Sequence, residues 1–315
     1  MPVDLRQLRY FLAIGDSGAL SYAAQSLNVA QSALSHHLQE LETNFGVPLV
    51  TRHPRGVTLT PAGRRLYEHT RTIMAAVARA ESDVQAFAER ATGPVSVGLP
   101  HTVTMRVALP LIRAIKQEFP DVMMGLVEAM SHPLVERLVQ NQLDIAVVYN
   151  APDDARLSSI PILEESLYLI GTPQFLKDLP NEVTFDNVLK LPLIMPHPDS
   201  TTASLVESYY LRNQLPARVM EFDSLFAISH ALAEGIGCSI LAKSTVTEIL
   251  GSGQVIAKRI VEPEVTRTLF LARNRDLART RASSEICNLI MRVIGEEVRA
   301  GRWEARWLEP TVSAI

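Results

Sequence analysis

Two shortages narrow the class of protein before any motif is considered. The 315 residues include only two cysteines, Cys238 and Cys287, which stand far apart. That number and spacing exclude a disulfide framework and a zinc finger, and they suit a reducing compartment. No run of about eighteen apolar residues occurs, so we expect no membrane span and no membrane partner. The opening residues, MPVDLRQLRY, carry charges and lack a signal-peptide pattern, so we expect a cytoplasmic protein.

The chain also lacks a large net charge of either sign. Its formal charge is −4, and its hydrophobic content of 47% is enough for a substantial core in two or three domains. Residues 1–60 are formally neutral, because their arginines and acids cancel: Arg6, Arg9, Arg52 and Arg55 against Asp4, Asp16, Glu40 and Glu42. Charge alone therefore gives no sign of a nucleic-acid partner.

Motifs for catalysis are missing as well. There is no Gly-x-Ser-x-Gly elbow, no glycine-rich phosphate loop and no His-Glu-x-x-His pair. Cys238 enters an apolar strand and Cys287 lies on the apolar side of the last expected helix. A redox sensor needs an exposed thiol of low pKa, so this pattern disfavours that role. We expect neither an enzyme nor a bound cofactor.

The N-terminal segment predicts a helix-turn-helix. Apolar residues from Leu5 to Ile14 follow helical spacing, Ser21 is a plausible N-cap for a second helix, and a third helix is expected from about Gln31 to Asn44. Two helices joined by a short turn form this motif. The expected buried side of the third helix consists of Ala33, Leu34, Leu38, Leu41 and Phe45. The small pair Ala23–Ala24 permits close helix crossing.

The start of the third helix and the hairpin after it supply candidate DNA contacts. The polar side chains that can reach base edges are Gln31, Ser32, Ser35 and His36. Strands expected at 49–52 and 57–59 enclose the turn HPRG and form a wing. Its candidate phosphate or minor-groove contacts are Arg52, Arg55, Thr58 and Thr60. A generic helical bundle with a hairpin remains the alternative.

These residues resemble the winged helix-turn-helix of LysR-type transcriptional regulators. The matching positions are Ala23–Ala24, Gln31, Ala33–Leu34–Ser35, Arg55–Gly56 and Thr60–Pro61–Ala62–Gly63. Ser32 departs from the family's usual proline, and His36–His37 replace a commoner Arg or Gln pair. Within the family, the segments VAQSALS, SVGLP and LDIAVVYN are most similar in sequence to the nitrogen-assimilation-control branch.

Residues 61–91 predict one long helix with a heptad seam. Leu66, Ile73, Ala80 and Phe87 form one row, and Thr70, Val77, Val84 and Ala91 form the second. We expect dimerisation through this linker, with Leu66, Ile73, Val77, Val84 and Phe87 in the seam. Packing of the helix on its own effector domain is the alternative. A dimer lets two recognition helices read an inverted repeat in double-stranded promoter DNA.

The remaining chain alternates strands and helices, which is typical of a parallel α/β sheet. The pattern occurs twice, with a return near residues 264–268, so two subdomains with a cleft are expected. The resemblance implies the same α/β layout, similar to periplasmic solute-binding proteins, a dimer of dimers (homotetramer) and contact with RNA polymerase. The expected divisions are 1–60 for DNA binding, 61–91 for the linker, and 92–310 for effector binding, with subdomain I at 92–161 and 267–300 and subdomain II at 162–266.

Ligands of open α/β sheets bind beyond the carboxyl ends of the strands, where helix N-termini favour anions. We therefore expect a small acidic effector to bind at the residues that follow the strands. These are Pro100, His101, Thr102, Ser131, His132, His197, Ser200, Thr201, Thr202 and Phe222. The regulator that this effector controls is an activator or a repressor. The three histidines allow a metal site, a pH sensor, effector contact or ordinary loop polarity, and no metal is expected. A ligand-binding module whose N-terminal helices serve only for assembly is the competing class.

Overall fold

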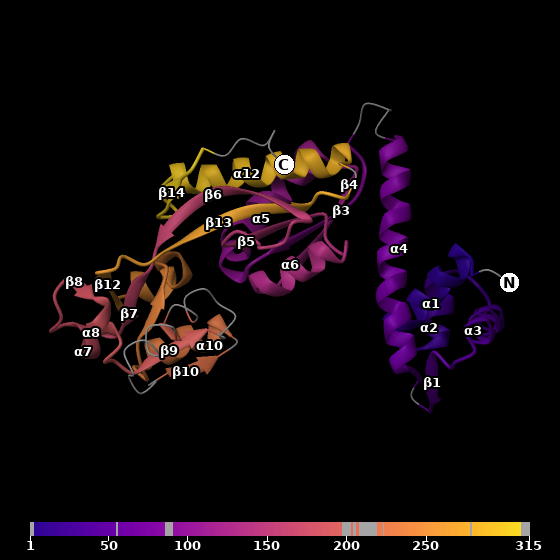
Figure 1. Cartoon of the computed structure of the whole chain (residues 1–315), viewed down its shortest axis with the longest axis horizontal. Coiled ribbons are helices and arrows are strands. Elements are labelled where there is room, and N and C mark those ends of the chain that lie inside the picture. The colour runs from indigo at the N-terminus through magenta and orange to yellow at the C-terminus, as the bar shows by residue number, and fades with distance from the viewer. Residues whose placement is uncertain are drawn as a thin grey trace. The chain divides into compact units, whose positions relative to one another are not determined.

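The structure is a computed structural model that describes residues 3–54, 56–85, 91–196, 203, 206–207, 219–222, 224–277 and 279–309. The chain forms two compact units, residues 1–88 with 140–142 and residues 89–139 with 143–315 (Figure 1). Among the described residues, no helix is both long and apolar enough to cross a membrane.

The first unit, called the head here, contains four helices and a hairpin in its described part. They are α1 (Leu5–Ser17), α2 (Leu20–Ser26), α3 (Gln31–Phe45), β1 (Val50–His53), β2 (Gly56–Leu59) and α4 (Pro61–Gln85). The predicted helix-turn-helix and wing are confirmed. Ser21 is not the N-cap of α2, however: that helix begins after Ala19 and has no side-chain cap.

Small residues let the parts of the head approach closely. Ala23 and Ala24 are buried within an apolar cluster whose larger members are Phe11, Ile14, Leu34, Leu38, Leu41 and Leu49. Gly56 has a φ of 137°, and a Cβ there would lie 2.3 Å from the carbonyl oxygen of Gly18. A Cβ on Gly63 would lie 1.9 Å from the carbonyl oxygen of Leu49. Both glycines of the wing motif are therefore required by backbone contact.

Helix α4 begins where the wing ends. Pro61 occupies its first position, where a missing N–H costs nothing. The Thr60 hydroxyl donates to the carbonyl oxygen of Pro48 at 2.8 Å and accepts from the amide of Gly63 at 3.0 Å. Thr60 is thus a local structural group, which corrects its prediction as a phosphate donor.

The second unit has two halves. The elements of the first half are β3 (Gly93–Leu99), α5 (His101–Glu118), β4 (Val122–Glu128), α6 (Ser131–Val139), β5 (Ile145–Tyr149), β6 (Leu157–Ser166), β13 (Thr266–Asn274), α12 (Arg281–Arg299) and β14 (Arg306–Trp307). Those of the second half are β7 (Tyr168–Gly171), α7 (Pro173–Leu176), β8 (Glu182–Thr184), α8 (Phe185–Val188), β9 (Leu193–Pro196), β10 (Val219–Phe222), α10 (Leu225–Ala233), β11 (Ser239–Leu241), the 3-10 turn η2 (Lys243–Thr245), α11 (Thr247–Gly251) and β12 (Ile256–Val261).

The first half is a six-stranded sheet of order β14-β6-β13-β5-β3-β4. Strand β3 is parallel to β4 and β5, as predicted, but β13 is antiparallel to both of its neighbours, so the sheet is mixed. Helices α5 and α12 pack together on one face, while α6 covers the other (Figure 1). The carboxyl ends of β3, β4 and β5 therefore share one edge.

The second half joins a four-stranded sheet, of order β11-β7-β12-β8, to the parallel pair β9–β10. The junction is at Cys238, whose carbonyl oxygen accepts from the amide of Ile194 at 2.7 Å. Its own amide donates to the carbonyl oxygen of Pro192 at 2.9 Å. Two short connections, at Leu167 and between Val261 and Thr266, link the halves, which is the predicted two-subdomain architecture.

Candidate nucleic-acid interface and candidate effector site

The N-terminal turns of α3 present the predicted base-reading side chains. Gln31, Ser32 and His36 are exposed and Ser35 is partly exposed, whereas Leu34 and Leu38 anchor the opposite side of the helix in the core. Ala33 and Phe45, which were expected on the buried side, are exposed. Ala33 therefore belongs to the exposed surface at the start of α3, together with Gln31 and Ser32.

The wing is connected to α3 by one hydrogen bond. Arg52 on β1 donates from Nη2 to the Ser35 hydroxyl at 3.1 Å. Thr58 faces Thr51 across the hairpin and is exposed. Of the predicted contacts, the structure brings Arg52 and Ser35 together. Arg55 lies outside the described residues.

Glu40 is a polar centre on α3 that the motif did not reveal. His36 Nε2 lies 3.4 Å from Glu40 Oε1, and His37 Nδ1 lies 3.2 Å from Glu40 Oε2. Gln7 of α1 donates to the same carboxylate at 3.3 Å. The ring of Tyr10 meets His37 edge-on, with centroids 5.2 Å apart. One carboxylate thus orients two imidazoles at the start of the helix.

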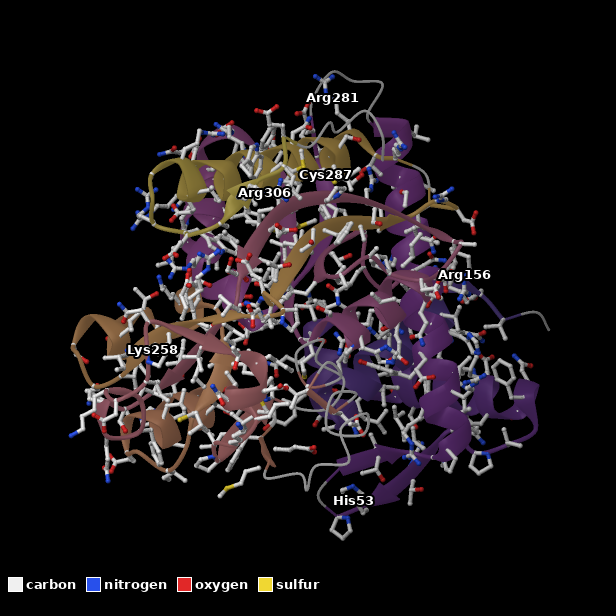
Figure 2. The ribbon with its side chains drawn as sticks, turned by 60° about the vertical axis from the view of Figure 1, so that its left-hand side comes forward. His53, Arg156, Lys258, Arg281, Cys287 and Arg306 are labelled. Carbon is white, nitrogen blue, oxygen red and sulfur yellow. The ribbon has the colours of Figure 1, made fainter. Side chains whose placement is uncertain are left out.

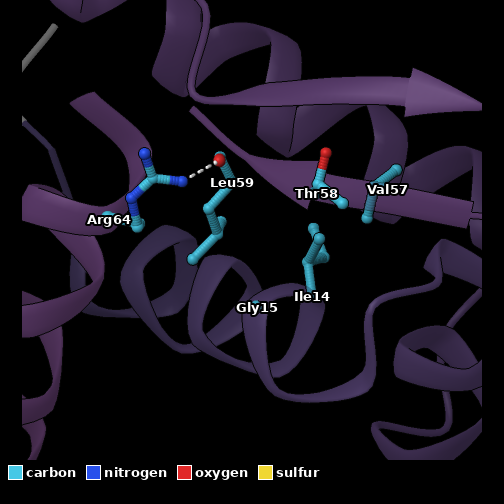
Figure 3. Close-up of a pocket in the computed structure, with 6 residues that line it drawn as sticks. All are labelled: Ile14, Gly15, Val57, Thr58, Leu59 and Arg64. Atoms are coloured by element: carbon cyan, nitrogen blue, oxygen red, sulfur yellow. Dashed lines mark hydrogen bonds between the residues drawn. The ribbon is translucent and has the colours of Figure 1, made fainter. Parts of the chain in front are cut away.

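A groove lies between α1, β2 and the first turns of α4. Its volume is about 320 Å³, and it is lined by Ile14, Gly15, Val57, Thr58, Leu59 and Arg64 (Figure 3). Arg64 donates from Nη1 to the carbonyl oxygen of Leu59 at 2.9 Å, which holds this cation beside the wing. No spacing in the sequence predicts that Arg64 and Thr58 line one groove.

The predicted seam of α4 divides into two parts. Leu66 packs against the apolar cluster of the head. Ile73 is 40% exposed and Val84 is 73% exposed, while Val77 is partly buried. Phe87 lies outside the described residues. The apolar surface available on α4 therefore begins beyond Leu66.

Two predicted effector residues, Thr102 and Ser131, contact Tyr149 at the end of β5. Pro100 is the N-cap of α5, and the Thr102 hydroxyl lies 2.9 Å from the Tyr149 hydroxyl. Ser131 accepts a hydrogen bond from the Tyr149 amide at 3.0 Å. His101 Nδ1 lies 2.8 Å from Glu128 Oε1. Burial raises the pKa of the Tyr149 phenol, so this group stays protonated at neutral pH.

Other predicted effector residues do not join this cluster. His132 is exposed and lies 3.5 Å from Glu136 on its own helix. Phe222 ends β10 in the other half and is 37% exposed. His197, Ser200, Thr201 and Thr202 lie outside the described residues. Among the described residues, no group of three or more His, Cys, Asp or Glu side chains could hold a metal ion.

Sequence reasoning missed a buried ion pair on the strands β6 and β13. Glu165 is 1% exposed and accepts from Arg267 Nε at 2.7 Å. Its other oxygen accepts from the Ser244 hydroxyl and from the Trp303 indole, each at 3.0 Å. Burial alone would raise the pKa of Glu165, but the guanidinium of Arg267 and these donors lower it. The Arg267 guanidinium also lies 3.8 Å from the centre of the Tyr149 ring.

This ion pair is part of a set of contacts between the two halves of the second unit. Arg106 on α5 donates to the carbonyl oxygen of Ser244 at 3.0 Å. Lys243 lies 3.1 Å from Glu304, which also accepts from the hydroxyl of Tyr168 at 2.8 Å. Residues after α12 therefore bind the turn η2 and strand β7 of the other half.

Both cysteines are buried, as predicted. Burial raises the pKa of the Cys238 thiol to about 12 and that of Cys287, on α12, to about 11 (Figure 2). Thiolate is scarce at neutral pH under these conditions, so neither sulfur is a ready nucleophile.

A winged helix-turn-helix followed by a long helix and a two-part α/β domain defines a DNA-binding regulator that carries its own effector domain. The chain matches "Bacterial regulatory helix-turn-helix protein, lysR family" over residues 5–64 and "LysR substrate binding domain" over residues 88–294. The chain belongs to the LysR family. It is a DNA-binding transcriptional regulator with an effector-binding domain and not an enzyme. The alternative of an N-terminal assembly module is set aside.

The relatives include the nitrogen assimilation regulatory proteins nac of Escherichia coli and Klebsiella aerogenes. The first is 32% identical over 306 residues, covering 96% of this chain and 99% of the relative. The second is 34% identical over 272 residues, covering 85% and 88%. These two relatives confirm the predicted resemblance to the nitrogen-assimilation-control branch.

Solved structures support the fold. Full-length CbnR in complex with its target DNA has a TM-score of 0.69 at 21% identity, covering 92% of this chain and all (100%) of that one. Full-length OxyR C199D from Pseudomonas aeruginosa has a TM-score of 0.68 at 20% identity, covering 93% and 95%.

Proposed function

We propose that the head reads base edges with Gln31, Ser32, Ser35 and His36 and holds the DNA backbone with the wing. The observation that carries this assignment is the hydrogen bond from Arg52 to Ser35, because it places wing and recognition helix on one continuous surface. Phosphate or minor-groove contacts come from Arg52, Arg55 and Thr58. Arg64, bonded to Leu59 in the groove that Thr58 also lines, adds a cation on that side.

The test is a footprint on the DNA upstream of the protein's own gene, repeated over a salt series. We expect protection over several helical turns with an imperfect inverted repeat inside it. Ser35→Trp should abolish this protection, whereas Thr43→Trp, a matched control near the far end of α3, should retain it. Wild-type protection by Ser35→Trp would remove Ser35 from the contact set. Binding that ignores sequence would refute the assignment of the whole surface.

We infer that two copies pair through the exposed part of α4 that includes Ile73, Val77 and Val84, with Phe87 continuing the seam. The exposed fractions of Ile73 and Val84 support this seam, since large apolar side chains at heptad spacing favour a partner helix. Leu66 is assigned to the head core instead. Sedimentation velocity should show dissociation for Ile73→Glu and Val84→Glu. His69→Glu, an exposed position off the seam, should leave assembly unchanged.

We propose that the effector is a small acid bound at the carboxyl edge of the first sheet. The contacts of Thr102 and Ser131 with Tyr149, beside Pro100 and His101 at the start of α5, support this location, because hydroxyls and a helix start favour an anion. His132, His197, Ser200, Thr201, Thr202 and Phe222 remain predicted contacts. Calorimetric titration with a panel of carboxylic acids tests the proposal. Thr102→Val should weaken binding, and Thr104→Val, on the same helix, should not. An acid that binds both variants equally would refute the site.

The wider arrangement remains part of this proposal. We place the DNA-binding domain at 1–60, the linker at 61–91 and the effector domain at 92–310, in a cytoplasmic dimer of dimers that meets RNA polymerase at the promoter. Effector binding would change the equilibrium between two arrangements of the DNA-binding heads. Mass photometry of the full chain, with and without promoter DNA, should show the tetramer. A dimer in both conditions would contradict this assembly.

A further inference from the structure

The recognition helix α3 has an unusual charge pattern for a surface that faces DNA. Its sequence, QSALSHHLQELETNF, contains no lysine and no arginine. Its two carboxylates are Glu40 and Glu42, and its only side chains that can become cations are His36 and His37. Glu42 is turned toward the wing, where Oε1 accepts from the amides of Leu49 and Val50 at 2.7 and 3.2 Å.

The two histidines differ in where they lie. The His36 side chain is 69% exposed, and the His37 side chain is 26% exposed. His37 meets the ring of Tyr10 on α1, so its imidazole is turned toward the head core. The exposed His36 side chain belongs to the N-terminal turns of α3, the part of the helix that the proposed function assigns to DNA.

The charged and titratable groups around His36 can be named from each neighbouring element. Glu40 and His37 face it from α3, with the His37 ring centroid 6.0 Å away. Tyr10 and Gln7 of α1 contact His37 and Glu40 respectively. Arg52 of the wing reaches the adjacent Ser35.

The protonation of His36 decides the charge that this surface offers to DNA. When both imidazoles are neutral, the charge of α3 is negative, and Glu40 repels phosphate. Histidine gains its proton between about pH 8 and pH 5, and the negative potential of DNA favours the charged form. A protonated His36 would offset the charge of Glu40, which lies 3.4 Å away.

We propose that DNA binding by this protein takes up a proton at His36, so that affinity for DNA rises as pH falls. This inference rests on the proposed function, because it requires α3 to lie against DNA. Glu40 positions the imidazole and sets a negative background against which the added proton has its effect. His37 contacts the same carboxylate from the core side and does not carry the response.

The experiment measures affinity by fluorescence anisotropy, using a labelled duplex from upstream of the protein's own gene and the full-length protein. Titrations are made at about pH 6, 7 and 8 and constant ionic strength. The wild type should bind about tenfold more tightly at the lowest pH than at the highest. His36→Gln should bind weakly with a nearly flat profile. His36→Arg should bind tightly with a flat profile, because guanidinium keeps its charge.

His37→Gln is the matched control and should keep the wild-type profile. Sedimentation at each pH confirms that assembly does not change. A steep dependence of affinity on pH in His36→Gln would overturn proton uptake at His36. Firm binding by the wild type with no dependence on pH would do the same. Neither result would contradict the proposed DNA surface. If His53→Gln abolished the pH dependence of DNA affinity while His36→Gln kept it, the response would belong to the wing. That result would also overturn proton uptake at His36. Failure to bind the duplex at every pH would contradict both this inference and the proposed DNA surface.

Discussion

The two polar centres of the molecule are built in opposite ways. In the head, Ser35, His36 and Arg52 come from a short stretch of chain and are wholly or partly exposed, and a single hydrogen bond joins Arg52 to Ser35. In the second unit, Glu165 and Arg267 stand 102 positions apart and form a buried pair. Their neighbours Ser244 and Trp303 come from two further segments.

The difference separates recognition from stability. Exposed charges near water contribute little to folding, so the head can change its contacts without losing its structure. A buried carboxylate has lost its water and depends on every donor around it. We expect substitutions in the head surface to change DNA affinity and substitutions in the buried pair to change the free energy of unfolding.

The largest expected effect follows removal of the buried charge. Glu165→Gln leaves Arg267 without its carboxylate and should destabilise the second unit by about 3–5 kcal/mol. Urea unfolding followed by tryptophan fluorescence measures this directly, since the only two tryptophans of the sequence, Trp303 and Trp307, belong to the second unit and Trp303 donates to Glu165. Glu164→Gln, which removes a more exposed pair with Arg306, is the control and should cost less than about 1 kcal/mol.

The pH dependence of the same pair gives an independent check. Because the pKa of Glu165 is lowered in the folded protein, its contribution is complete above its ordinary pKa of 4.5 and is lost as pH falls through the folded value. Glu165→Gln should remove this acid-dependent part. An unchanged acid transition in that variant would mean that another carboxylate controls it.

The next effect concerns the head as a folding unit. Gly63→Ala places a Cβ against the carbonyl oxygen of Leu49 and should cost about 3 kcal/mol of head stability, with loss of DNA binding. The tryptophan transition of the second unit should not move. Gly251→Ala, where a Cβ meets nothing within 4 Å, should change neither property. A shift of the tryptophan transition in Gly63→Ala would show that the two regions are not independent.

A smaller effect is expected for the contact between wing and recognition helix. Arg52→Ala should weaken DNA binding about tenfold and reduce the salt slope by about one, with unchanged helix content by circular dichroism. Arg156→Ala removes an exposed ion pair with Asp154 in the second unit and should leave binding unchanged. Equal effects of both substitutions would point to general charge instead of a local contact.

The smallest effect tests the head's local stability. Asp4 caps α1 by accepting from the amide of Gln7 at 2.7 Å, so Asp4→Ala should cost about 1 kcal/mol in thermal unfolding of the head. The sequence preference for DNA should stay the same. A changed footprint would mean that α1 influences base reading.

The sequence predicted the head almost completely because its signals are local. Periodicity located α1 and α3, and Gly56 and Gly63 marked the wing and its exit. Local patterns did not show the packing between elements. Ala33 is exposed instead of buried, and the Thr60 hydroxyl is hydrogen-bonded to the backbone of Pro48 and Gly63. Side chains of similar chemistry differ in role only through such neighbours.

The second unit was predicted in its element order and less well in its contacts. The alternation of strands and helices placed Thr102 and Ser131 at strand ends, but Tyr149, which joins them, read as part of a strand. Periodicity carries no strand direction, so the antiparallel pairing of β13 was missed. The pair of Glu165 and Arg267 depends on register between distant strands, which no short motif encodes.

The double hydrogen bond of Thr60 has a mechanical consequence. One hydroxyl holds the last turn before the wing through Pro48 and the first turn of α4 through Gly63, so hairpin and long helix share a rigid pivot. Helix α4 has 25 residues, which makes a lever about 37 Å long. If α4 turns about this pivot, the hairpin that carries the proposed contact Arg52 turns with it.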